Sequence, residues 1–223
     1  MTSGKRFKGV LFDLDGTLLD TAPDMAAALN QLLREENGTM LEYERLRPTV
    51  SHGARGLINA GFGATIDAGL RERLTERFLE IYAAALANET APFAGVEQVL
   101  AALEESATPW GIVTNKPGWL TRPLLDGLDF AGTAVCVICG DSLPERKPHP
   151  EPLLHAARLL DTHPAECIYV GDAERDIEAG RAAGMTTIIA GYGYIPDDEF
   201  PQQWQADGYI DHAHELMEWL NNR

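Results

Sequence analysis

Two aspartates separated by one residue, Asp13 and Asp15, follow the apolar segment GVLF and precede Gly16 and Thr17. Carboxylates this close together on a tight turn repel each other unless a cation joins them or one of them holds a proton. Aspartates are also common as turn and capping residues, so this pair alone leaves a structural interpretation open. A chemical role requires partners elsewhere in the chain.

A second pair of acids, Asp172 and Asp176, follows the apolar segment CIYVG. Taken alone, these two could be first-turn acids at the positive end of a helix. Together with Asp13 and Asp15 they offer oxygen ligands only, a set that favours magnesium over zinc or iron. The sequence therefore predicts a Mg²⁺ site held by Asp13, Asp15, Asp172 and Asp176.

Thr114 and Asn115 end the apolar run WGIVTN, and Lys147 lies in the segment ERKPHP. A hydroxyl and an amide can hydrogen-bond phosphate oxygens, and an ammonium group beside a carboxylate cluster can neutralise transferring charge. Taken singly, these residues would be a strand-end turn and a solvated loop lysine. Together with the aspartates they indicate phosphoryl chemistry.

The elements that must position these residues are short apolar runs typical of buried parallel strands. Between them lie helical patterns such as 96–103, 152–160 and 177–183, and a last strand is predicted at 208–210. This alternation predicts an open α/β sheet wound on both faces. Ligands of such sheets bind at the carboxyl ends of the strands, where the polar residues should meet. The runs are GVLFDLDG, WGIVTN, AVCVICGD, CIYVGD and TTIIAG.

Residues from about 20 to 88 break the alternation, because amphipathic helical patterns follow one another without a strand-like run. The sequence therefore predicts a helical insertion after the first strand. One helix carries Met25, Ala28, Leu29 and Leu32, and another carries Leu70, Leu74, Phe78, Ile81 and Tyr82.

The formal net charge of -16 disfavours nucleic acid and anionic membranes as partners. No stretch is long and apolar enough for a membrane span, and the start from Lys5 onward lacks a signal-peptide pattern. Three cysteines are too few for a disulfide framework, and the CxxC of Cys136 and Cys139 lies in a strand-like run. We expect a cytoplasmic protein that acts as a monomer or homodimer.

The motifs Asp13-Leu14-Asp15-Gly16-Thr17, Thr114-Asn115, Lys147-Pro148 and Gly171-Asp172 with Asp176 resemble, in this order, those of haloacid dehalogenase superfamily phosphatases. The resemblance covers essentially the whole chain. It implies an α/β fold with a Rossmann-like parallel-sheet core, residues 1–19 and 91–223, and an inserted all-helical cap, residues 20–90.

The resemblance also implies roles for these residues. Asp13 would attack phosphorus, and Asp15 would protonate the leaving alcohol and later activate water against the phosphoaspartate. Mg²⁺ would be held by Asp13, the backbone carbonyl of Asp15 and Asp172, with Asp176 orienting bound water. Catalytic Thr114 and Lys147 would hold the phosphoryl group, while Thr17 and Asn115 would bind substrate.

The segment SHGAR, residues 51–55, combines cations with a glycine. In the phosphatases that the chain resembles, this cap segment reads the part of the substrate beyond the phosphate. Arg55 could pair with a substrate carboxylate, and His52 and Lys116 are further candidate contacts. A surface arginine at a helix start is the alternative for Arg55, and Arg175 is a weaker candidate contact beside the fourth motif.

Within the superfamily, Asp15 argues against dehalogenases, and the absence of lysine from residues 20–88 argues against phosphonate hydrolysis. The segments FDLDGTLLDTAPD, VTNKP, RKPHPEPLL and GYGYI resemble phosphoglycolate phosphatases most. They also resemble phosphatases of N-acetylmuramic acid 6-phosphate, which serve cell-wall recycling. We predict a small carboxylate-bearing phosphate ester as substrate, 2-phosphoglycolate first; a sugar-phosphate mutase or a binding module without turnover are the rival interpretations.

Overall fold

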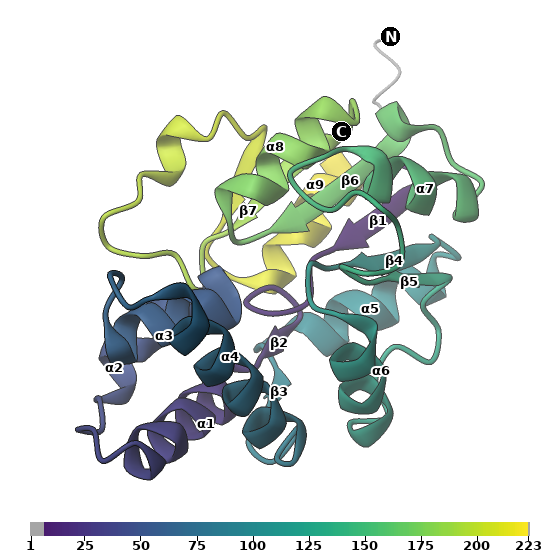
Figure 1. Ribbon diagram of the computed structural model, residues 1–223. Coiled ribbons are helices and arrows are strands. Elements are labelled where there is room, and N and C mark those ends of the chain that lie inside the picture. The colour runs from purple at the N-terminus through teal and green to yellow at the C-terminus, as the bar shows by residue number, and fades with distance from the viewer. Residues whose placement is uncertain (1–6, 223) are drawn as a thin grey trace, which may run out of the picture.

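A computed structural model describes residues 7–222 and contains one six-stranded sheet in the order β5-β4-β1-β6-β7-β8. All neighbouring strands of this sheet pair in parallel (Figure 1). The first strand lies inside the sheet, because β4 flanks it on one side and β6 on the other. The strands are β1 (Gly9–Phe12), β4 (Trp110–Val113), β5 (Cys136–Ile138), β6 (Cys167–Gly171), β7 (Thr186–Ala190) and β8 (Gly208–Ile210).

Helices cover both faces of the sheet. Successive side chains of a strand point to opposite faces, so alternate residues of the buried strands enter two separate apolar cores. Val10 and Phe12 of β1 pack in one core with residues of α5, α6 and α9, whereas Leu11 enters the other core with residues of α7 and α8. These helices are α5 (Val96–Glu105), α6 (Gly118–Gly127), α7 (Glu151–Leu159), α8 (Glu174–Ala182) and α9 (Leu216–Asn222).

A group of helices between β1 and β4, here called the insertion, spans residues 22–83 and has an apolar core of its own. It lies beside the loops that connect it to the sheet (Figure 1). Leu120 of α6 and Tyr194 join this core, so it is continuous with the rest of the molecule. The insertion consists of α1 (Ala22–Glu35), α2 (Tyr43–Leu46), η1 (Arg47–His52), α3 (Gly53–Phe62) and α4 (Ala68–Ala83).

Two short strands mark where the chain enters and leaves the insertion. β2 (Leu19–Asp20) pairs antiparallel with β3 (Ala91–Pro92), so Leu19 lies opposite Pro92 and Asp20 opposite Ala91. Asp24 in the first turn of α1 accepts hydrogen bonds from the backbone N–H of Thr90, at 3.0 Å, and from its hydroxyl, at 2.7 Å. The outgoing and returning segments are therefore joined by side-chain as well as backbone hydrogen bonds.

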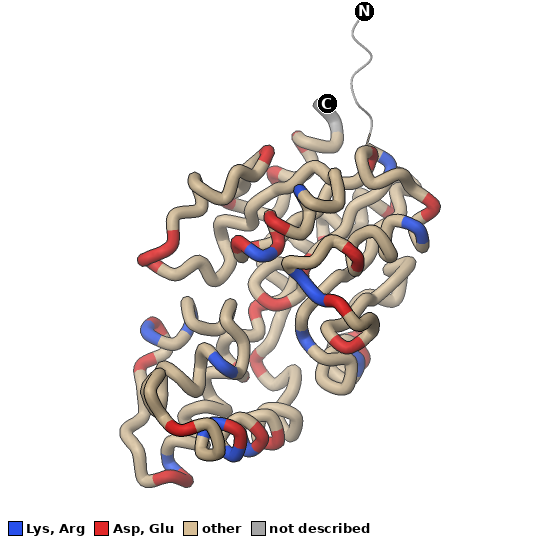
Figure 2. The backbone as a smooth tube through the Cα atoms, turned by 45° about the horizontal axis from the view of Figure 1, so that its top comes forward, with Lys and Arg blue, Asp and Glu red and all other residues tan. Residues whose placement is uncertain are grey.

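The predicted α/β class with a parallel sheet is confirmed, and the strand predicted at 208–210 coincides with β8. The domain boundaries after residue 19 and before residue 91 remain a prediction. Residues 1–6, including the start at Lys5, and Arg223 lie outside the described residues. Within the part described, no helix is both long and apolar enough to cross a bilayer. Acidic positions are spread over the trace and interspersed with basic ones (Figure 2).

Candidate active site

The loop after β1 carries the first two aspartates and depends on a glycine. Gly16 has φ +83°, in the region that favours glycine, and a Cβ there would lie 2.2 Å from Asp172 Oδ2. The loop thus passes close against the end of β6. The loop that begins with Asp13 therefore lies next to Asp172.

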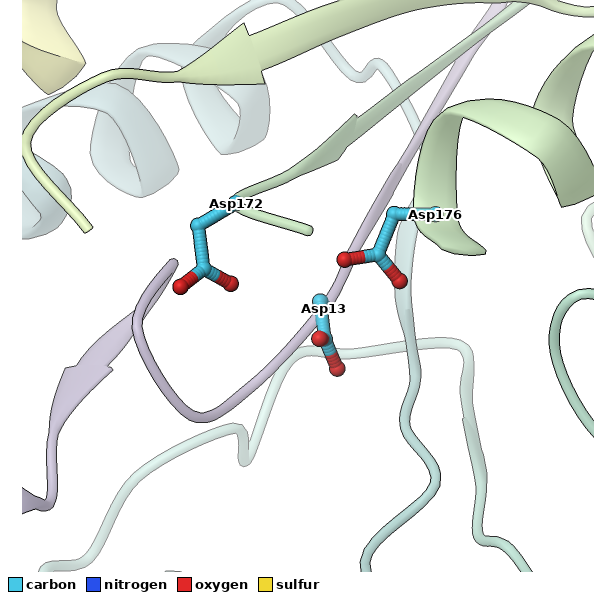
Figure 3. Close-up of side chains that lie close together, drawn as sticks. All are labelled: Asp13, Asp172 and Asp176. Carbon is cyan, nitrogen blue, oxygen red and sulfur yellow. The ribbon is translucent and has the colours of Figure 1, made fainter. Parts of the chain in front are cut away.

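Three carboxylates converge at the carboxyl ends of β1 and β6 (Figure 3). Asp13 follows β1, Asp172 follows β6, and Asp176 lies in the first turn of α8. One oxygen from each lies within 4.8 Å of the others, and all three side chains are buried. A buried group of three acids is a site that a divalent cation could occupy.

Lys147 connects two of these carboxylates. Its Nζ lies 2.9 Å from Asp13 Oδ1 and 2.7 Å from Asp176 Oδ1, and it donates a hydrogen bond of 2.8 Å to the hydroxyl of Tyr169. Asp176 is further fixed because its Oδ2 accepts the backbone N–H of Ala173 at 3.1 Å. Lys147 is 2% exposed, so these pairs form in a nearly dry environment.

Asp172 lacks a cationic partner of this kind among the described residues. Its oxygens accept hydrogen bonds from the backbone N–H of Tyr194, at 2.9 Å, and from the Thr17 hydroxyl, at 3.4 Å. Burial, together with the nearby charges of Asp13 and Asp176, raises the pKa of Asp172 to about 7. Burial likewise raises the pKa of Asp13, against the opposing effect of Lys147. The cluster therefore has fewer positive charges than its carboxylates need, which fits a bound cation.

Asp15 is not one of the three clustered acids, and its carboxylate contacts a second lysine. Lys116 Nζ lies 3.0 Å from Asp15 Oδ1 and donates a 2.9 Å hydrogen bond to the hydroxyl of Tyr82, on α4 of the insertion. The hydroxyl of Thr21 donates to the same Asp15 oxygen at 2.7 Å. The predicted Asp15 side chain is thus held by one residue from the sheet region and one from the entrance to the insertion.

The predicted phosphate ligands occupy different positions. Thr114 is buried, and its hydroxyl oxygen accepts the backbone N–H of Lys116 at 3.2 Å, which leaves its proton to donate. The side-chain amide of Asn115 makes two hydrogen bonds to the backbone of Lys147. It donates to the Lys147 carbonyl at 2.9 Å and accepts from the Lys147 N–H at 3.1 Å. Asn115 therefore positions Lys147, and Thr17, which is fully buried, contacts Asp172.

The predicted residues of segment 51–55 do not enter the cluster. His52 is exposed, with Nε2 3.6 Å from Glu199 Oε1, and Arg55 is exposed on α3. A different contact joins this segment to the site, because the Arg175 guanidinium donates a 2.8 Å hydrogen bond to the carbonyl oxygen of Ser51. Arg175 immediately precedes Asp176 in α8.

A family model described as haloacid dehalogenase-like hydrolase matches residues 10–190. The chain belongs to this family. The match includes Asp13, Asp15, Lys147 and Asp172, and both the predicted family and the predicted fold class are confirmed.

Two of the relatives of this hydrolase carry different names. It is 46% identical over 211 residues to a phosphoglycolate phosphatase of Xanthomonas campestris pv. campestris, with 95% of each chain covered. It is 41% identical over 217 residues to an N-acetylmuramic acid 6-phosphate phosphatase of Pseudomonas aeruginosa, with 97% of this chain and 96% of that one covered. The predicted class, a phosphoric monoester hydrolase, is thereby confirmed.

A solved structure supports the same fold for the hydrolase. The crystal structure of a predicted phosphoglycolate phosphatase from Haemophilus somnus matches with a TM-score of 0.84 at 25% identity, covering 96% of this chain and 97% of that one.

Three tyrosines of the hydrolase's site were not identified from the sequence. Tyr82 belongs to an apolar helix pattern and Tyr169 to the apolar run CIYVG, and both patterns predict a core residue rather than a site residue. Tyr194 lies in the GYGYI segment, and its hydroxyl donates to Asp20 Oδ1 at 2.7 Å. A polar hydroxyl within a buried run was the available signal, because such a group needs a hydrogen-bond partner.

Proposed function

We propose that this hydrolase cleaves 2-phosphoglycolate through a phosphoaspartate on Asp13, with Mg²⁺ as the metal. The observation that carries the proposal is the cluster of Asp13 with Asp172 and Asp176, in which Lys147 pairs with Asp13 and Asp176, while Asp15 pairs separately with Lys116. This arrangement supports one carboxylate as the nucleophile that attacks phosphorus and another as the group that transfers the proton.

In the first step, a carboxylate oxygen of Asp13 forms a bond to phosphorus while the bond from phosphorus to the ester oxygen breaks. Asp13 Oδ1 already accepts the Leu14 N–H, at 2.8 Å, and faces Lys147, so we assign the attack to Oδ2. Asp15 gives its proton to the departing alkoxide. General acid assistance of this kind contributes about 10² to 10⁴ in rate.

In the second step, Asp15 takes a proton from water, whose oxygen attacks phosphorus and releases the Asp13 carboxylate together with inorganic phosphate. Two displacements let a fixed carboxylate make the first attack in place of a loosely held water. Lys147 and the Thr114 hydroxyl are assigned to bind the phosphoryl oxygens, which lowers the repulsion between Asp13 and the anionic substrate.

Asp13 and Asp172 are the side chains that would hold Mg²⁺ directly, because both are buried oxygen donors and Asp172 forms no ion pair with a cation of the described residues. The backbone carbonyl of Asp15 is the third proposed ligand, and Asp176, which is also buried, would act through bound water. When bound, the metal supplies positive charge that offsets the charge on the attacking carboxylate and the phosphate.

The substrate assignment follows the relatives at 44–46% identity that are named phosphoglycolate phosphatase. N-acetylmuramic acid 6-phosphate is the second candidate, because two relatives at 39–41% identity carry that name. Both substrates bear a carboxylate. We further propose a cytoplasmic location, small-molecule partners only, and a monomer or homodimer.

The test is Mg²⁺-dependent phosphate release from a panel containing both esters and simple phosphomonoesters. We expect 2-phosphoglycolate to give the highest kcat/KM, and Asp13→Asn to abolish turnover while the circular dichroism spectrum stays unchanged. A higher kcat/KM for N-acetylmuramic acid 6-phosphate would replace the substrate assignment. Near wild-type turnover by Asp13→Asn would exclude the phosphoaspartate mechanism.

A further inference from the structure

Most cations at the border between the insertion and the sheet are already engaged. Lys147 pairs with Asp13 and Asp176, and Lys116 pairs with Asp15. Arg47 donates to the carbonyl oxygens of Gly193 and Tyr192, each at 3.0 Å, and its guanidinium lies over the ring of Tyr194. These groups hold the site together and are not free to bind a second anionic group of the substrate.

Arg175 is engaged differently. It is partly buried, and no carboxylate of the described residues lies within salt-bridge distance of it. It donates a hydrogen bond to a neutral acceptor, the Ser51 carbonyl oxygen, at 2.8 Å. A guanidinium has five N–H donors, so one bond to a carbonyl leaves a donor edge for a planar anion.

Arg175 also lies in the electrostatic field of the catalytic carboxylates. Burial acts to lower its pKa, but Asp176, Asp13 and Asp172 outweigh burial and raise the pKa above its ordinary value. The guanidinium is therefore near the acid cluster without forming an ion pair to any of its members. Arg175 also immediately precedes Asp176 in α8, so its backbone lies at the edge of the acid cluster.

The chemistry of the substrate restricts where its carboxylate can bind. In 2-phosphoglycolate a single carbon atom separates the ester oxygen from the carboxylate, so the two anionic groups must occupy neighbouring positions. Arg55 is exposed on α3, four residues after Ser51, whereas Arg175 is adjacent in sequence to Asp176. The short substrate thus favours the arginine on the sheet side over the arginine of the insertion.

Resting on the proposed function, we propose that Arg175 binds the carboxylate of the substrate, while its contact to Ser51 places the insertion against the bound ester. The carboxylate would receive two parallel N–H donors from the guanidinium, a geometry that lysine does not reproduce. Arg175 is then the residue that makes this hydrolase prefer esters with a carboxylate next to the phosphate.

The test compares two esters that differ in this group, 2-phosphoglycolate and 2-hydroxyethyl phosphate. The ratio of their kcat/KM values measures recognition of the carboxylate, because everything else about the phosphate site is shared. We expect Arg175→Gln to lower this ratio by about 10- to 100-fold, chiefly through KM, since a charge-assisted pair is worth roughly 1.5–3 kcal/mol. Arg175→Lys should lower it by a smaller factor, since charge remains but the second donor does not.

Arg181→Gln is the matched control, because Arg181 is an exposed arginine on the same helix. The ratio of the two kcat/KM values in Arg181→Gln should equal that of the wild type. An equal loss for both esters in Arg175→Gln would mean that Arg175 only balances the acid cluster, and would overturn the proposal. So would an unchanged ratio, or a loss of the ratio in Arg55→Gln instead. If Arg175→Gln does not fold, Arg175→Lys decides by the same comparison.

If 2-phosphoglycolate is not the preferred substrate, the same experiment gives a different result. In that case the wild-type enzyme itself would hydrolyse the two esters with similar kcat/KM. A wild-type preference for 2-phosphoglycolate that survives in both Arg175 variants would leave the proposed function standing and remove only the role of Arg175.

Discussion

Lys116 Nζ donates a 2.9 Å hydrogen bond to the hydroxyl of Tyr82, near the C-terminal end of α4. The same ammonium group lies 3.0 Å from Asp15 Oδ1. A residue of the insertion therefore helps to position the lysine that holds the proposed acid and base. The hydrogen bond is buried, so its loss leaves a charged donor without one of its acceptors.

Tyr82→Phe should lower both stability and turnover. Removing the hydroxyl costs about 1–3 kcal/mol, or a few degrees in Tm, because Lys116 stays buried with one acceptor fewer. We expect kcat to fall about 3- to 10-fold as Asp15 and Lys116 lose their fixed arrangement. Steady-state kinetics and thermal melts measure the two effects. Tyr209→Phe, at an exposed tyrosine, is the control and should change neither; unchanged kcat in Tyr82→Phe would show that Asp15 does not depend on this contact.

The metal-free hydrolase should lose stability as pH rises from about 4 to 7. The pKa of Asp172 is raised from 3.8 to about 7, chiefly by burial, so the folded state binds this proton more tightly than the unfolded state does. Its contribution to stability is therefore present at low pH and is lost as pH rises through the folded pKa.

Mg²⁺ should reverse this loss. Because the metal requires the deprotonated carboxylate, it should raise Tm more at about pH 8 than at about pH 5. Thermal melts with EDTA or Mg²⁺ at both pH values measure the difference, and Asp172→Asn should weaken both the pH trend and the effect of the metal. An equal rise in Tm at the two pH values would contradict the role of Asp172 as a ligand.

Gly16→Ala should weaken metal binding. The new Cβ would lie 2.2 Å from Asp172 Oδ2, so either the loop or the carboxylate must move. Gly184→Ala separates this effect from backbone strain, because Gly184 has a similar φ of +75° but nothing within 4 Å of the added Cβ. We expect both variants to lose about 1–2 kcal/mol of stability, and only Gly16→Ala to need about tenfold more Mg²⁺ for half-maximal activity. Similar Mg²⁺ dependence in the two would assign the effect to strain alone.

Tyr194→Phe should destabilise the protein without changing its need for metal. The hydroxyl donates to Asp20 Oδ1 at 2.7 Å and accepts the Ala22 N–H at 3.0 Å, whereas the bond to Asp172 comes from the Tyr194 backbone. We expect a loss of about 1–3 kcal/mol and a Mg²⁺ titration within about twofold of wild type. A tenfold shift in that titration would show that the hydroxyl also fixes the loop around Asp172.

Most of the candidate site could be predicted from the polar residues that follow the apolar strand segments. Asp13 and Asp172 follow β1 and β6, which are neighbours in the sheet, so their convergence follows from the rule that parallel strands deliver ligands at their carboxyl ends. Buried strands also have long apolar runs, which is why the sequence located them well. The helical pattern of the insertion was equally readable from its apolar stripes.

Contacts between the insertion and the sheet region could not be read in this way. Periodicity says that Tyr82 faces inward, but not that its hydroxyl meets Lys116, because that depends on how two separately packed units dock. The same applies to the contact of Arg175 with Ser51. β2 and β3 have two residues each, too few to show an alternating pattern.

The pairing of β2 with β3 places the chain's departure from the sheet region directly beside its return. Paired residues on antiparallel strands lie only about 5 Å apart. Another segment whose two ends are equally close could therefore replace the insertion at these positions without changing the order or pairing of the strands in the six-stranded sheet. Recombination at two neighbouring points of the chain can thus give a descendant a new specificity and leave the inherited phosphoryl-transfer chemistry unchanged.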